Sequence, residues 1–139
     1  EVALLMTIPG VQKQSAMTIL AEIGADMKMF ATAAALVGWA GMRPRNEESA
    51  GKIKSRKTLH GNKFLRVIIV QCAWAASRTK NGRFAQKFKY LSSRMNSQKA
   101  LVAIARKLLV IVWNVLSKNE PFDYTKGINN KPGIVQVLN

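Results

Sequence analysis

The segment from Gln98 to Lys118 limits the folds open to this chain more than any other stretch. Its apolar residues recur at helical spacing along one side, and further apolar residues cover much of the opposite side. A helix that is apolar on nearly every side has to be buried, either within its own domain or against a partner. Arg106 and Lys107 interrupt the run, so it contains no stretch of about 18 uncharged apolar residues, the length that suits a membrane span. The pattern therefore predicts a buried helix in an all-α, water-soluble domain.

Helical periodicity extends over most of the remaining chain. The predicted helices are residues 1–7, 13–23, 33–41, 63–77, 83–94 and 98–118. The predicted caps are Gly24 after the second helix, Asp26 or Thr32 before the third, Asn62 before the fourth and Ser97 before the last. The helix at 63–77 is apolar nearly all round beyond Arg66, which predicts a place in the middle of a core. In the helix at 83–94, Phe84, Phe88 and Leu91 are expected to face the core.

A chain of 139 residues fits one domain with a sizeable core. We place this compact domain at residues 1–126 and interpret residues 127–139, where the apolar pattern fades, as a tail. The chain begins within an apolar pattern and shows no leader segment, which suggests a piece of a longer protein. The single Cys72 lies in an apolar run and has no partner for a disulfide within the chain, so we expect a buried thiol in an intracellular protein.

Positive charge is concentrated in the middle of the sequence. Seventeen of the 22 Lys and Arg lie between Arg43 and Lys107, where the acids are Glu47 and Glu48 alone. A generically soluble surface mixes both signs, whereas a field of one sign and this size indicates a polyanionic partner. Nucleic acid is favoured over an acidic membrane surface.

Residues 43–63 predict a long basic surface loop. This stretch has no aromatic residue, two glycines and many cations, and loops of this length in compact domains are usually functional or disordered. Ser49, Ser55 and Thr58 each carry a hydroxyl that can attack phosphorus, with cations close in sequence. Composition does not choose among them, and a serine near a glycine also serves as a turn or cap residue.

Ten basic residues are candidates for nucleic-acid contacts. Lys63 and Arg66 lie in the first turns of a predicted helix, and a helix N-terminus favours bound anions. The full set is Arg43, Arg45, Lys52, Lys54, Arg56, Lys57, Lys63, Arg66, Arg83 and Lys87.

The N-terminal turn at Pro9, Gly10 and Val11 resembles a helix-hairpin-helix motif. In that motif the turn offers backbone N–H groups to a DNA phosphate, and glycine permits close approach. Gln12 stands where a full motif has a second glycine. An ordinary helical hairpin that packs through Ala16 is an equal alternative.

Several motifs recur in the order typical of one family. They are Ile8-Pro9-Gly10, then Gly38-Trp39-Ala40-Gly41-Met42-Arg43-Pro44, then Ser49-Ala50-Gly51, His60-Gly61-Asn62-Lys63-Phe64-Leu65-Arg66, Ala103-Ile104-Ala105-Arg106-Lys107-Leu108-Leu109 and Tyr124. Over residues 5–125 the chain resembles the C-terminal transposase domain of the DEDD-type insertion-sequence transposases, the bridge-RNA-guided recombinases.

The resemblance implies a helical DNA-recombining domain in which Ser49 attacks the DNA backbone and forms a phosphoserine link. It implies no cofactor in this chain, because magnesium would be held by Asp and Glu of a separate N-terminal, resolvase-like domain. The implied partners are DNA, a guide RNA, that N-terminal domain and further copies of the protein in an active oligomer. The implied setting is the prokaryotic cytoplasm, at the nucleoid and not at a membrane.

Two other functions fit the residues. One is a non-catalytic helix-hairpin-helix module in which Ser49 is a turn residue, and the other is a basic RNA-binding structural protein. Spaced Asp and Glu upstream in the reading frame would favour the recombinase, whereas a natural start near Glu1 would favour a small binding protein.

Overall fold

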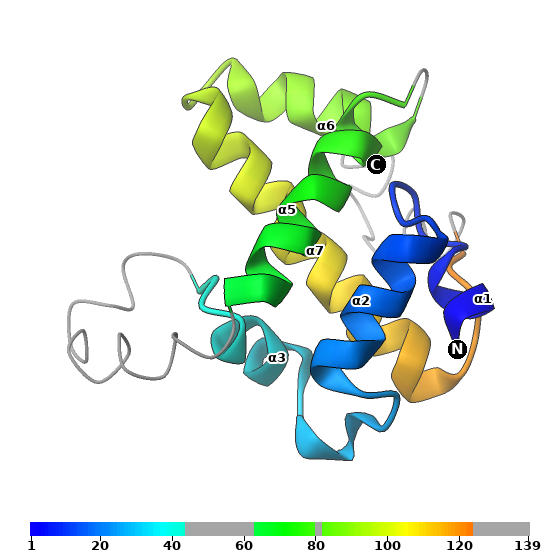
Figure 1. Ribbon diagram of the computed structural model, residues 1–139. Helices are drawn as coiled ribbons and strands as arrows, with labels where there is room; N and C mark the ends of the chain where they lie inside the picture. The colour runs from blue at the N-terminus through cyan, green and yellow to red at the C-terminus, as the bar shows by residue number, and fades with distance from the viewer. Residues whose placement is uncertain (44–62, 80–81, 124–139) are drawn as a thin grey trace, which may run out of the picture.

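The computed structural model describes residues 1–43, 63–79 and 82–123, and these ranges contain helices and connecting turns but no strand (Figure 1). The elements are α1 (Val2–Leu5), α2 (Lys13–Ile23), the 3-10 turn η1 (Met27–Met29), α3 (Ala33–Trp39), α5 (Lys63–Ser77), α6 (Arg83–Ser92) and α7 (Ser97–Lys118). The predicted all-α class is confirmed. The predicted basic loop, the boundary at residue 126 and the tail lie outside the described residues.

Helix α7 forms the spine of the domain, as the strongest sequence signal predicts. It contacts α1, η1, α3, α5 and α6, and every residue from Ala100 to Leu116 is buried or half-buried. Trp113, on the side of α7 that faces η1 and α3, donates its indole N–H to the Phe30 carbonyl at 3.0 Å. Much of the apolar surface of α7 is therefore covered within the chain itself. By length and composition α7 could also cross a membrane, a test that core helices of water-soluble domains pass as well.

Helix α5 is less buried than its sequence predicts. Leu65, Ile69 and Ala73 face the core, where α5 packs on α2, α6 and α7. On the opposite face Phe64 is 65% exposed and Trp74 52%. The prediction that α5 occupies the middle of the core is wrong, because the 22-residue α7 fills that place and the 15-residue α5 lies on its flank. The apolar periodicity of a helix shows which of its faces is buried, but it does not show which of two apolar helices lies nearer the centre of the core.

Local capping explains where the helices begin and end. Gly24 ends α2 at a φ of 78°, and both predicted acceptors are used, since Asp26 caps η1 and Thr32 caps α3. The cap of α7 is Asn96 and not Ser97, because the Asn96 side chain accepts a hydrogen bond from a first-turn backbone N–H. Both residue types are good N-caps, so neighbouring candidates are easily confused by one position. The predicted cap Asn62 lies outside the described residues.

The basic helix α6 shows the expected division between core and solvent. Phe84 is 2% exposed, while Phe88 and Leu91 pack partly buried against the core cluster. The expectation that these three side chains face the core is confirmed. The cations of α6 lie on its remaining faces.

Candidate nucleic-acid interface

The N-terminal hairpin is held against α5 by a glycine. Gly10 has a φ of 87°, and a Cβ built there would overlap the Cys72 carbonyl oxygen and lie 2.9 Å from the Ala76 backbone nitrogen. Val11 on the same turn is buried. The glycine thus permits close packing of the turn on the helix that begins with Lys63. Packing accounts for Gly10 without a phosphate, and the phosphate-binding role of Pro9, Gly10 and Val11 stays a prediction.

The end of α3 is shaped by a second glycine. Gly41, at a φ of 76°, donates its N–H to the Gly38 carbonyl at 3.0 Å. The N–H of Met42 donates to the Val37 carbonyl, also at 3.0 Å. This pair of bonds is the Schellman arrangement, in which a left-handed residue reverses the chain and brings an apolar residue back onto the helix. Met42 and Val37 are both buried accordingly.

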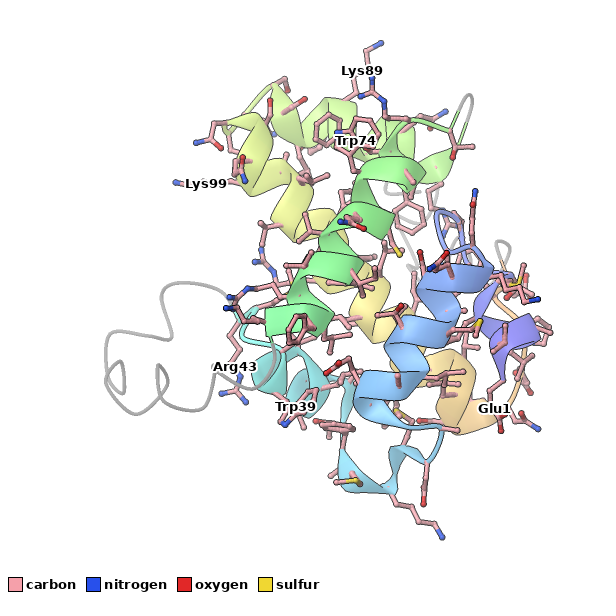
Figure 2. All side chains as sticks on the ribbon, viewed as in Figure 1. Glu1, Trp39, Arg43, Trp74, Lys89 and Lys99 are labelled. Atoms are coloured by element: carbon pink, nitrogen blue, oxygen red, sulfur yellow. The ribbon has the colours of Figure 1, made fainter. Side chains whose placement is uncertain are left out.

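The reversal places Arg43 over the helix it has just left. A Cβ built at Gly38 would overlap the guanidinium of Arg43, so the absence of a side chain at residue 38 provides the room for that group. Figure 2 shows Arg43 beside α3, at the point where the described chain stops before residue 44. The chain reversal and the room at Gly38 therefore place a cation at the start of the serine-bearing segment.

Arg43 lines an open groove of about 720 Å³ together with three other cations. Lys87 comes from α6, and Arg106 and Lys107 come from α7. The lining is completed by Ala34, Val37, Leu91, Ala103 and Val110, and no acidic residue is among the described lining residues. Because α3 and α6 both pack on α7, side chains far apart in sequence meet on one surface of the central helix.

The groove favours an anion on electrostatic grounds. Arg106 is half-buried, and a cation that is partly removed from water loses hydration that a nearby anion can replace. Four cations around one hollow also raise the local concentration of a polyanion. The groove can therefore hold phosphates.

The other described candidates, Lys63, Arg66 and Arg83, are not among the residues that line this groove. Lys63 is exposed and Arg66 half-buried at the start of α5. The guanidinium of Arg83 lies 6.0 Å from the ring centre of Phe122, near the end of the described chain. Six predicted site residues lie outside the described residues: Ser49, Arg45, Lys52, Lys54, Arg56 and Lys57. The alternative nucleophiles Ser55 and Thr58 also lie there.

Arg106 and Lys107 were missed as candidate site residues. In the sequence these two residues interrupt an apolar run. The interruption could have identified them, because two adjacent cations within a buried helix have to contact solvent, a counter-ion or a ligand. Their distance in sequence from Arg43 concealed the shared site.

The described residues contain neither a metal-binding cluster nor a reactive thiol. They contain no group of three His, Cys, Asp or Glu side chains that could hold a metal ion. Burial raises the pKa of the Cys72 thiol, and a hydrogen bond with Ser15 opposes this only in part. A buried thiol with a raised pKa is a poor nucleophile, so the role predicted for Cys72, a small buried apolar residue, holds.

The fold and the groove define a class of protein: an all-α domain with a basic groove whose described lining residues include no acid, a composition typical of domains that bind polyanions. The chain belongs to the transposase family IS116/IS110/IS902, whose sequence model matches residues 2–89. The match spans the hairpin, Arg43, the serine-bearing segment and Lys87. The resemblance to insertion-sequence transposases is thus confirmed at the level of the family.

Similarity to individual relatives extends further along the chain. The chain is 33% identical over 124 residues to the pilin gene-inverting protein of Moraxella bovis, and the match covers 87% of this chain and 38% of that protein. It is 29% identical over 120 residues to the transposase for insertion sequence element IS1111A of Coxiella burnetii, covering 84% of this chain and 33% of that protein. The chain therefore spans only 33–38% of the length of these relatives.

Proposed function

We propose that this chain is the DNA-binding, serine-bearing domain of an insertion-sequence transposase, acting in strand cleavage and exchange in the prokaryotic cytoplasm. The observation that carries the proposal is the four-cation groove, whose Arg43 begins the segment that contains Ser49. Six residues of fully extended chain span at most about 20 Å, so a backbone phosphate in the groove lies in the neighbourhood that Ser49 can reach. Family membership supports the same conclusion.

The proposed reaction is a transfer of one phosphoryl group from DNA to serine. The Oγ of Ser49 attacks phosphorus, a new bond from Oγ to phosphorus forms, and the bond from phosphorus to one deoxyribose oxygen breaks. The serine proton passes to a base, and the departing sugar oxygen takes up a proton. A second attack by the hydroxyl of another strand reverses these steps and joins the strands, which regenerates the serine.

A serine hydroxyl is a weak nucleophile and needs a base or a metal ion beside it. Magnesium, which Asp and Glu of the separate resolvase-like domain would hold, would supply this activation and would neutralise charge on the transferring phosphoryl group. The groove cations hold the flanking phosphates, and Arg45 and Lys52 contribute charge nearer the reacting phosphorus. In this assembly a guide RNA and further copies of the protein are the remaining partners.

The test of the nucleophile uses the full-length protein. Ser49→Ala should abolish strand exchange and the covalent adduct between protein and DNA, while DNA affinity changes by no more than a few-fold, because the hydroxyl supplies chemistry and little contact. Ser55→Ala is the matched control and should remain active. If Ser49→Ala is active and Ser55→Ala is not, the assignment of Ser49 is wrong.

The test of the groove measures duplex DNA binding as a function of salt. For each phosphate neutralised, the slope of log K against log salt changes by about 0.9. Arg106→Ala should therefore reduce the slope by about one and weaken binding to all sequences alike. Lys118→Ala, which removes an exposed cation at the end of the same helix, should change the slope much less. Equal effects of the two substitutions would show that general charge, and not the groove, binds the DNA.

A further inference from the structure

The groove combines charge with an apolar floor. On α7 the lining residues are Ala103, Arg106, Lys107 and Val110, which form one face of the helix at the spacing i, i+3, i+4 and i+7. Val37 from α3 and Leu91 from α6 add aliphatic surface on either side of that face. The groove lining therefore combines four cations with aliphatic side chains, and we call these aliphatic side chains the floor of the groove.

This composition does not match the needs of an intact DNA duplex. A duplex presents phosphates and sugars to a protein surface, while the faces of its bases are stacked against one another. Cations alone satisfy the phosphates, and a recessed aliphatic floor adds nothing to that contact. A floor of this kind is useful to a ligand with an apolar face, such as the face of an unstacked nucleobase.

We propose that the groove binds an unpaired nucleotide, with its base against the aliphatic floor and its phosphates on Arg43, Lys87, Arg106 and Lys107. The groove is open to solvent, so the bound nucleotide can remain part of a continuous strand. A groove of about 720 Å³ is within the size range of sites for small organic ligands, which suits one nucleotide with its neighbouring phosphates.

The inference rests on the proposed function and specifies the state of its substrate. Strands that exchange partners have to separate their bases beside the break, and unstacking a base costs free energy. A groove that accepts the released base offsets part of that cost. It also keeps the strand next to Arg43, where the serine-bearing segment begins.

The experiment compares oligonucleotides with equal charge and different base content. The 139-residue chain is titrated with a 12-nucleotide oligothymidine, with an abasic strand of the same length, and with a 12-base-pair duplex. We expect oligothymidine to bind at least about fivefold tighter than the abasic strand, since stacking of bases adds affinity beyond the phosphate contacts.

Two variants fill the groove and leave every cation in place. Ala103→Phe projects from α7, and Ala34→Phe projects from an exposed position on α3 and keeps the test valid if the first variant does not fold. Each should reduce the preference for oligothymidine to less than about twofold while duplex affinity stays within about twofold. Trp74→Ala, at an exposed aromatic residue of α5 outside the groove lining, is the control and should leave the preference unchanged.

Failure of this inference differs from failure of the proposed function. If the wild-type chain binds the abasic strand as tightly as oligothymidine, or if the filling variants weaken all three ligands equally, the groove does not bind a base. If Trp74→Ala removes the preference instead, the base is bound on α5. In either case Arg106→Ala can still weaken DNA binding and Ser49→Ala can still abolish strand exchange, so the proposed function survives.

Discussion

The substitution Gly38→Ala should stabilise helix α3 and at the same time displace the Arg43 side chain. Gly38 lies within α3, its φ is not in the left-handed region, and the groups that a new Cβ would meet belong to the end of the Arg43 side chain. Replacing a helical glycine by alanine stabilises a protein by about 0.5–1 kcal/mol where the backbone permits it. Arg43 is exposed and can move away at small cost. The melting temperature should therefore rise by roughly 2–4 °C.

The same substitution should weaken nucleic-acid binding. A displaced Arg43 no longer contributes fully to the groove, so we expect a loss of about three- to tenfold in affinity for duplex DNA and a salt slope smaller by up to about 0.9. A double-mutant cycle with Arg43→Ala tests the cause. Gly38→Ala should have no further effect on binding once Arg43 is alanine. A lower melting temperature, or an equal loss of affinity in the Arg43→Ala background, would refute the positioning role of Gly38.

Three further predictions concern packing, titration and the missing half of the protein. Gly10→Ala should lower the free energy of unfolding, measured by urea denaturation, by about 3–5 kcal/mol, and Gly24→Ala should lower it by about 1–3 kcal/mol. Both glycines have positive φ, but of the two only Gly10 would place a Cβ against backbone atoms. Equal losses of stability would contradict the packing of the hairpin on α5. Because burial raises the pKa of Cys72 above its unfolded value, stability should be constant below about pH 8 and decrease as the pH rises further, and Cys72→Ala should remove that decrease. When the chain is incubated with magnesium and DNA, it should neither cut the DNA nor form a covalent adduct with it, unless the remaining part of the full-length protein is added in trans. Cleavage of DNA by the chain alone would show that its active site is complete.

The sequence predicts the helices of this domain well because each depends on local signals. The bounds of α2 and α5 agree with periodicity and with their terminal residues, and the 3.6-residue repeat in α6 identifies Phe84 as a core residue. Which apolar helix is central depends on contacts between helices. For that reason α5 was expected in the middle of the core, although its Phe64 and Trp74 are exposed.

The candidate groove was only partly predictable. Arg43 and Lys87 were selected for their charge, and charge density is visible in a sequence. Their meeting with Arg106 and Lys107 depends on the packing of α3 and α6 on α7, which no local pattern specifies. The contact between Gly38 and Arg43 was also hidden, because it requires the chain reversal at Gly41 and not merely a small residue in a helix.

The position of α7 in the chain determines when the domain can fold during synthesis. The central helix α7 is the last helix described, yet α1, α3, α5 and α6 all pack against it. Until Leu116 has left the ribosome, the earlier helices lack the surface of α7, on which α1, α3, α5 and α6 bury apolar side chains. At roughly 5–20 residues per second this interval lasts several seconds after α1 emerges. During that time a strongly cationic, partly apolar chain is exposed to cellular nucleic acid and to other nascent proteins, so its yield should depend on chaperones that shield apolar segments.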